Sequence, residues 1–177
     1  MNRPGPVISF GLASLLAFSI CVLAPADARA QDASVPAEGL DWKAFEEAVT
    51  QAEAQDKKLI VDVYAAWCPW CRRLQREVYT DESVQAYVRD HFVLTRLDAE
   101  NTEDSLSFRD YTLTPSEMAA GLGASGFPTT VFLDEEGRYI TRLPGFMAAP
   151  EFLEVLTYIG SEAFVDFTFE EYQEEEE

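Results

Sequence analysis

The stretch that most constrains this chain is Leu59–Cys71, in which an apolar run ends at two cysteines separated by two residues. Five of the six residues from 59 to 64 are apolar or aromatic, which predicts a buried parallel strand. Pro69 suits the first position of a helix, where a missing N–H costs nothing. The stretch therefore predicts a strand leading into a helix that opens at Cys68 and runs to about Tyr79.

The spacing of Cys68 and Cys71 indicates redox chemistry. Two residues at i and i+3 of a helix lie on one face, within the short Cα separation that a disulfide needs. At a helix N-terminus, unpaired N–H groups and the helix dipole favour a thiolate over a thiol. We therefore expect Cys68 to be the nucleophile and Cys71 to resolve the mixed disulfide, with both joined in the oxidised state.

Other uses of two cysteines are weaker interpretations. The chain has only three cysteines and one histidine, His91, which is too few for a zinc site within one chain. Haem attachment needs a histidine directly after the second cysteine, and that residue is Arg72. A metal site shared between chains and a purely structural disulfide stay open as alternatives. We expect no metal and no cofactor, and we assign His91 no role.

At these residues the sequence resembles the thioredoxin superfamily. Asp62 stands six residues before Cys68, where thioredoxins carry a buried carboxylate. The segment 126–134 is similar to the family's active-site cis-proline, here Pro128, followed by a strand. Gly145 matches the glycine that closes the substrate groove. The resemblance implies an α/β thioredoxin fold, with a central mixed sheet flanked by helices and an insertion before the cis-proline strand.

The resemblance also implies roles for individual residues. Asp62 would accept the proton of Cys71, its own pKa raised by burial. Thioredoxins commonly carry a lysine where this chain has Leu94, and Arg96 is the candidate substitute. The residues implied to contact substrate are Trp67, Pro69, Trp70, Phe127, Pro128 and Gly145.

Within the superfamily, the chain looks most like periplasmic proteins of the SoxW type and the soluble C-terminal domain of the DsbD reductase. Residues 71–79, 142–146 and 151–153 carry this likeness. It implies a monomeric thiol–disulfide oxidoreductase that reduces protein disulfides, with a membrane electron donor of the DsbD type as a candidate partner. The alternatives are a disulfide-forming or isomerising oxidase of the same fold, and a non-catalytic binding or chaperone module.

The beginning of the chain predicts export. Arg3, an apolar stretch over 7–23 and the motif Ala28-Arg29-Ala30 are typical of a cleaved signal peptide, and an uncleaved membrane anchor is the alternative. Cleavage after Ala30 removes two arginines and one aspartate, so the formal charge of −19 becomes about −20. Such a charge disfavours nucleic acid and anionic membranes as partners. The mature protein, periplasmic or otherwise exported, keeps only Cys68 and Cys71 as thiols.

Patterning along the chain predicts how the domain is organised. The expected parts are a signal peptide over 1–30, a linker over 31–40, a thioredoxin-like domain over 41–169 and a disordered acidic tail over 170–177. We expect the insertion, about 100–125, to border the dithiol and help to select substrates. The remaining expected elements are a helix capped by Asp41 that runs to Gln55 with Trp42 on its apolar face, a helix after Asp81, a strand over 92–98, a hairpin over 129–143 and a helix over 150–160.

Overall fold

The structure, a computed structural model, describes Met1 and residues 33–176. Apart from Met1, the predicted signal peptide lies outside these residues. None of the helices in the described part of the chain has the length and apolar character needed to cross a membrane. The elements in chain order are β1 (Trp42–Lys43), α1 (Phe45–Gln55), β2 (Lys58–Tyr64), α2 (Pro69–Glu77), α3 (Glu82–His91), β3 (Phe92–Asp98), β4 (Leu106–Phe108), β5 (Tyr111–Leu113), α4 (Pro115–Gly121), β6 (Thr129–Leu133), β7 (Tyr139–Pro144), α5 (Ala149–Gly160), the 3-10 helix η2 (Ala163–Val165) and α6 (Phe169–Glu176).

The five-stranded sheet has the order β1-β3-β2-β6-β7, with β2 in the centre. β2 runs parallel to β3, so that Asp62 lies opposite Arg96, and antiparallel to β6, so that Asp62 lies opposite Thr130. β7 pairs antiparallel with β6, and β1 pairs parallel with β3. The sheet is therefore mixed, as predicted, and the apolar run of the sequence forms its central strand, which is buried from Lys58 to Val63.

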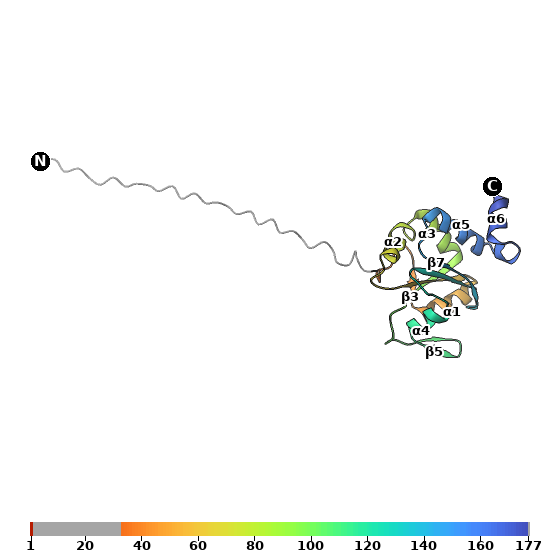
Figure 1. The fold of residues 1–177 in the computed structure, drawn as a ribbon, viewed down its shortest axis with the longest axis horizontal. Helices are drawn as coiled ribbons and strands as arrows, with labels where there is room; N and C mark the ends of the chain where they lie inside the picture. The colour runs from red at the N-terminus through yellow and green to blue at the C-terminus, as the bar shows by residue number, and fades with distance from the viewer. Residues whose placement is uncertain (2–32, 177) are drawn as a thin grey trace.

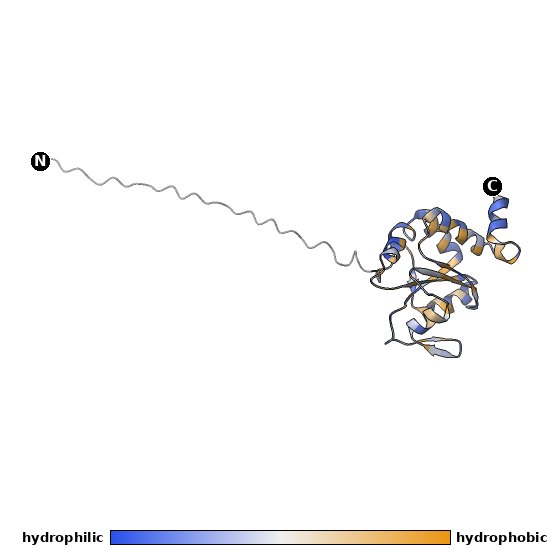
Figure 2. Ribbon diagram, viewed as in Figure 1, coloured by the Kyte–Doolittle hydropathy of each residue, from blue (hydrophilic) through white to orange (hydrophobic). Residues whose placement is uncertain are grey.

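Helices cover both faces of this sheet (Figure 1). Because side chains alternate along a strand, Ile60 packs with α2, α3 and α5, whereas Leu59 and Val61 pack with α1 and α4. In Figure 2 the apolar colour is concentrated where these helices meet the sheet. Asp62 shares the face of Ile60, so the only acidic residue of β2 points toward the α2 side.

The start of the first helix differs from the prediction. α1 begins at Phe45 after Ala44, and Asp41 does not cap it. Trp42 instead lies in β1, where it pairs with Leu94. Its indole Nε1 donates to the carbonyl of Ala37 at 3.1 Å, and its ring meets Tyr79 edge-on with centroids 5.0 Å apart. These long-range contacts hold the residue in the sheet.

Residues 33–40 were predicted to be a linker, and this is wrong. Ala33 has none of its surface exposed, and Ala37 is also buried. The Ala33 N–H donates to the Ala66 carbonyl at 3.1 Å, in the turn just before Cys68. The folded domain therefore begins at least as early as Ala33.

The disordered tail predicted over 170–177 is also contradicted, because residues up to 176 form α6. The Thr168 N–H donates to Glu171 at 2.8 Å, and the Glu171 N–H donates back to the Thr168 hydroxyl at 3.3 Å, which caps the helix. Phe169 and Tyr172 contact the Tyr158 ring at centroid distances of 5.2 and 5.3 Å. Two aromatic side chains thus dock this acidic segment on α5.

The insertion between β3 and β6 contains the β4–β5 hairpin and α4. Phe108 of the hairpin contacts Phe45 of α1 at 5.5 Å, and the Ser107 N–H donates to Glu46 at 2.8 Å. Figure 1 shows the hairpin on the α1 side of the sheet, with α2 on the other side. The insertion, about 100–125, was expected to border the dithiol, but none of its residues, all of which the structure describes, packs in the cysteine cluster or lines the pocket that contains Phe127.

Candidate active site

The two predicted cysteines lie at the start of α2, just after the turn that connects it to β2. Cys68 is the residue that caps α2, and its sulfur accepts the Cys71 N–H at 3.0 Å. Pro69 occupies the first helical position, as the sequence predicts. Cys68 and Cys71 form a disulfide with their Cα atoms 5.3 Å apart. A free amide N–H at a helix start stabilises negative charge, so this geometry favours a thiolate at Cys68 once the disulfide opens.

The disulfide is almost closed off from water. Cys68 and Cys71 are 2% and 1% exposed, and they pack in one cluster with Ala33 and Ala65. Tyr64 and Phe127 pack against this cluster. The two sulfurs therefore offer very little surface to a reagent.

Asp62 is fully buried and lies on the face of the sheet that α2 covers, where it contacts Gln75 of that helix. Its Oδ2 accepts the Gln75 Nε2–H at 2.7 Å and the Arg96 Nε–H at 2.8 Å. Its Oδ1 has no hydrogen-bond partner among the described residues. Burial raises the pKa of Asp62, and the charge and hydrogen bonds of Arg96, with the hydrogen bond of Gln75, act in the opposite direction.

Arg96, the candidate substitute for the family's lysine, forms an ion pair with Asp62 at 2.8 Å. The parallel pairing of β2 with β3 sets the two residues side by side, and both side chains are shielded from solvent. The Arg96 guanidinium also stacks over the Tyr64 ring, 4.0 Å from its centroid. The sequence did not predict a role for Gln75, because nothing in the pattern around a single helical glutamine indicates a buried hydrogen bond.

Tyr79 is a second buried polar group near this network that the sequence did not reveal. Its hydroxyl has no hydrogen-bond partner at ordinary distance among the described residues. Burial raises the pKa of Tyr79 well above its usual value, and the charge of Asp62 acts in the same direction. The tyrosine therefore stays protonated, and its hydroxyl keeps its hydrogen to donate.

A groove opens beside the disulfide, with a volume of about 400 Å³. The peptide bond Phe127–Pro128 is cis, as the family resemblance implies. The Gly145 N–H donates to the Pro128 carbonyl at 2.8 Å, and the φ angle of +85° at Gly145 is one that glycine adopts without strain. The residues that line the groove are Trp70, Arg73, Phe127, Gly145 and Phe146.

Of the predicted substrate-contacting residues, Trp67, Pro69 and Pro128 are not among those that line this groove. Trp67 is 62% exposed and meets the Phe127 ring at 6.2 Å, and Trp70 is 51% exposed and meets Phe146 at 5.7 Å. Pro69 lies between them, exposed at the start of α2. Arg73 and Phe146 were not selected from the sequence, although the Arg73 guanidinium lies 4.4 Å from the Phe146 ring centroid.

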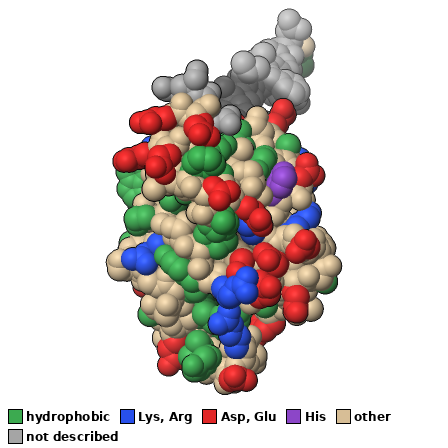
Figure 3. Space-filling view, turned by 90° about the vertical axis from the view of Figure 1, so that its right-hand side faces the viewer, with side chains coloured by type: hydrophobic (Ala, Val, Ile, Leu, Met, Phe, Trp, Pro, Cys, Tyr) green, Lys and Arg blue, Asp and Glu red, His purple; other side chains and the backbone are tan. Residues whose placement is uncertain are grey.

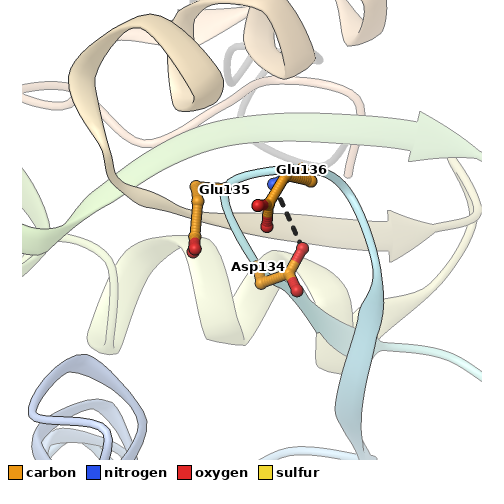
Figure 4. A group of neighbouring side chains, drawn as sticks. All are labelled: Asp134, Glu135 and Glu136. Carbon is orange, nitrogen blue, oxygen red and sulfur yellow. Dashed lines mark hydrogen bonds between the residues drawn. The ribbon is translucent and has the colours of Figure 1, made fainter.

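Three neighbouring carboxylates lie at the β6–β7 turn, at the other end of the sheet from the dithiol: Asp134, Glu135 and Glu136 (Figure 4). Asp134 accepts the Glu136 N–H at 3.1 Å, and Arg138 forms ion pairs with Asp134 and Glu136 at 2.5 and 2.7 Å. These contacts are those of a turn stabilised by its own side chains, and exposed acidic groups of this kind are common without a metal.

Comparisons with known proteins agree with this geometry. The model of the thioredoxin-like domain matches residues 45–160. The chain is 30% identical over 125 residues to the thiol:disulfide interchange protein DsbD of Actinobacillus pleuropneumoniae, which covers 66% of this chain and 20% of that protein. The chain thus spans about a fifth of the length of this curated relative.

Solved structures include two with comparable folds. A putative disulphide-isomerase from Bacteroides thetaiotaomicron is 32% identical, with a TM-score of 0.55 over 72% of this chain and 98% of that chain. A thioredoxin from Thermus thermophilus is 25% identical, with a TM-score of 0.57 over 68% of this chain and 87% of that chain. With a disulfide at the start of α2 and a family match over most of the folded domain, this chain belongs to the thioredoxin-like family of thiol–disulfide oxidoreductases.

Proposed function

We propose that the protein is an exported oxidoreductase that reduces disulfide bonds of periplasmic proteins through Cys68 and Cys71. The observation that carries the proposal is the Cys68–Cys71 disulfide at the start of α2, packed against Phe127, which also lines the apolar groove. The groove would bind the substrate, the cysteines would exchange with its disulfide, and the Asp62 carboxylate would handle the proton.

In the first step, the Cys68 thiolate of the reduced protein attacks one sulfur of a substrate disulfide. The substrate S–S bond breaks, a mixed disulfide forms between Cys68 and the substrate, and the other substrate sulfur leaves as a thiolate that takes up a proton. The Cys71 N–H, 3.0 Å from the Cys68 sulfur in the oxidised state, supports Cys68 as the attacking group.

In the second step, Cys71 attacks the Cys68 sulfur of the mixed disulfide and releases the second substrate thiolate. The dithiol has then given two electrons to the substrate, and the Cys68–Cys71 disulfide is formed again. We propose that Asp62 accepts the Cys71 proton before this attack. Its raised pKa supports this role, because a base works best when its pKa approaches the working pH.

The groove residues would hold an extended segment of the substrate. We propose that the backbone at Phe127–Pro128 pairs with the substrate next to its disulfide, as in other cases where a peptide adds a strand to an exposed edge. Trp67, Trp70, Pro69 and Gly145 would then flank the segment, which the exposure of the two tryptophans supports.

Several observations support the reducing direction and export. Pro69 and Trp70 add no charge that would stabilise the Cys68 thiolate strongly, and strong stabilisation is what an oxidant needs. The similarity to DsbD supports a thiol:disulfide interchange partner, and we propose a membrane protein of the DsbD type as electron donor. The signal motif ending near Ala30, just before the first residue of the described domain, Ala33, supports secretion, and we propose that the domain is monomeric.

The charge of the surface supports protein rather than nucleic acid as the partner. Asp and Glu side chains are spread over the face drawn in Figure 3, with fewer Lys and Arg among them. The whole chain has 32 acidic and 13 basic residues. A nucleic acid would meet repulsion from such a surface.

The direct test is the reduction of insulin with dithiothreitol, in which the wild type is compared with Cys68→Ser. We expect the wild type to accelerate the reaction and the variant to lose the acceleration. Equal rates for both would instead favour a non-catalytic binding or chaperone module.

The direction is tested separately by the reduction potential of the Cys68–Cys71 couple. A value near roughly −270 mV would fit a reductant, and one near roughly −120 mV would make the protein a disulfide donor. The second candidate function, a disulfide-forming or isomerising enzyme, is favoured by the similarity to the putative disulphide-isomerase, and the higher potential would select it.

A further inference from the structure

The buried Asp62 carboxylate is held by two residues that are themselves held by the N-terminal segment 33–37. Arg96 reaches Asp62 through Nε, and its other two nitrogens donate to the carbonyls of Ser34 and Ala33 at 2.9 and 2.7 Å. On the other side, the Ala37 N–H donates to Gln75 Oε1 at 2.7 Å, while Gln75 Nε2 donates to Asp62. Both residues that donate hydrogen bonds to Asp62 in the described structure are therefore also hydrogen-bonded to the same five-residue segment.

The segment is also part of the wall around the sulfurs. Ala33 is fully buried against Ala65, Cys68 and Cys71, and its N–H is bonded to the turn that precedes Cys68. It precedes the region that matches the family model, which begins at residue 45. The enclosure of the dithiol thus depends on chain outside the matched region.

We propose that residues 33–37 are a positioning segment that fixes Arg96 and Gln75 on Asp62 and thereby sets how tightly this carboxylate binds a proton. The physical reason is that a fully buried carboxylate without a fixed positive partner strongly prefers its neutral form. A guanidinium fixed at 2.8 Å in a site shielded from water favours the ionised form far more than a mobile, hydrated one does.

Arg96 is the decisive charge in this site. Of the described groups, the other titratable residue that interacts with Asp62 is Tyr79, and Cys68 and Cys71 do not titrate while they are joined in the disulfide. β6 places Thr130 opposite Asp62, and α3 and α5 add apolar side chains such as Val88 and Leu156. Loosening Arg96 should therefore raise the pKa of Asp62. The effect of this pKa increase on catalysis rests on the proposed role of Asp62 as proton acceptor.

The test uses two leucine substitutions in the full chain. Ala33 is fully buried, so the larger side chain of Ala33→Leu has no room unless the backbone moves. The substitution should therefore push the Ala33 and Ser34 carbonyls away from Arg96. Val35→Leu is the matched control, because Val35 is exposed in the same segment. The pKa of the Asp62 carboxyl is measured in the oxidised protein by carbon NMR titration, which requires no substrate.

We expect Ala33→Leu to raise the pKa of Asp62 above that of the wild type and of Val35→Leu. The increase should be smaller when Arg96 has already been replaced by methionine, because the effect passes through Arg96. Arg96→Lys, which keeps the charge but loses the three-way fork, should also raise it and provides a result if Ala33→Leu fails to fold. An unchanged pKa in Arg96→Lys and, where it folds, in Ala33→Leu would overturn the inference.

The pH profile of insulin reduction separates this inference from the proposed function. If the segment acts on Asp62 and Asp62 accepts the proton, the profile of Ala33→Leu moves to higher pH with the carboxyl pKa. A raised pKa with an unmoved profile would support the positioning segment and remove Asp62 from the mechanism. An unmoved pKa would refute the positioning segment even in a protein that reduces insulin normally.

Discussion

Replacing Arg96 by methionine gives the sharpest test of the buried charge pair. The methionine keeps an apolar side chain beside the Tyr64 ring but removes the guanidinium that stacks on it. Asp62, which has no exposed surface, then keeps only Gln75 as a described hydrogen-bond donor. The carboxyl must either stay charged without a cation or take up a proton.

The two choices set the size of the effect. Leaving one partner of a buried ion pair uncompensated costs about 3–5 kcal/mol. Protonating a carboxyl whose ordinary pKa is 3.8 costs about 1.4 kcal/mol per pH unit above that value, or about 4 kcal/mol at pH 7. The carboxyl adopts whichever of these two states costs less free energy. The electrostatic part of the loss in unfolding free energy is therefore at most about 4 kcal/mol at pH 7 and about 1.6 kcal/mol at pH 5.

The sign of the pH dependence follows from the raised pKa of Asp62. When a carboxyl has a higher pKa in the folded state than in the unfolded state, it does not lower the free energy of unfolding below its ordinary pKa. Above that pH, it lowers the free energy of unfolding increasingly until the pH reaches the pKa of the folded state. The variant raises the folded pKa further, so its deficit against the wild type should grow from pH 5 to pH 7. The lost hydrogen bonds to Ala33 and Ser34 add a part that does not vary with pH.

Urea unfolding at pH 5 and pH 7 measures this difference. Arg76→Met is the matched control, because Arg76 is exposed on α2 and its nearest ion-pair contact, Glu77, is 4.0 Å away. The control should change the free energy of unfolding by less than about 0.5 kcal/mol at either pH. An Arg96→Met deficit of the same size at both pH values would refute the reasoning, because it would show that no buried carboxyl titrates with it.

Four further predictions concern the reaction and the core. Cys71→Ser should trap a covalent complex between Cys68 and a disulfide substrate, visible on a non-reducing gel and absent when Cys68 is also replaced. Asp62→Asn should slow the second step more than the first in stopped-flow kinetics, and equal slowing of both would exclude it as the base. Trp70→Ala should raise KM for insulin about 2-fold to 10-fold, by loss of an aromatic contact, without changing the reduction potential. Leu156→Ala, at a fully buried position of α5, should lower the free energy of unfolding by about 2–5 kcal/mol in urea titration, whereas a loss below that range would mean that the core closes around the cavity.

The sequence predicted the elements whose signals are local. The apolar run before Cys68, the proline at the start of α2 and the aspartate at position 81 each specify a strand, a helix start or a helix cap within a few residues, and the structure has all three. The cysteine pair was equally legible, because its chemistry depends on a spacing of three residues. Asp62 and Pro128 came from family resemblance rather than from local pattern.

The parts that the sequence missed depend on contacts between distant residues. Residues 33–37 look like part of a linker, and distant residues hold them on the domain, among them Arg96, more than 60 positions away, which donates to the carbonyls of Ala33 and Ser34. Trp42 looks like the first apolar position of a helix until β3 offers it a partner strand. The high charge of the acidic C-terminal segment predicts disorder, yet the rings of Phe169 and Tyr172 pack against the ring of Tyr158.

The acidic turn at residues 134–137 has a practical consequence. β6 runs antiparallel to β2, so Thr129 lies beside Val63 at the dithiol end and Leu133 lies beside Leu59 at the other end. Four residue steps of a strand separate the two ends by about 13 Å. A fluorophore or a surface linker attached at Glu135 would therefore leave the groove open, and an immobilised protein would present its dithiol outward to a passing substrate.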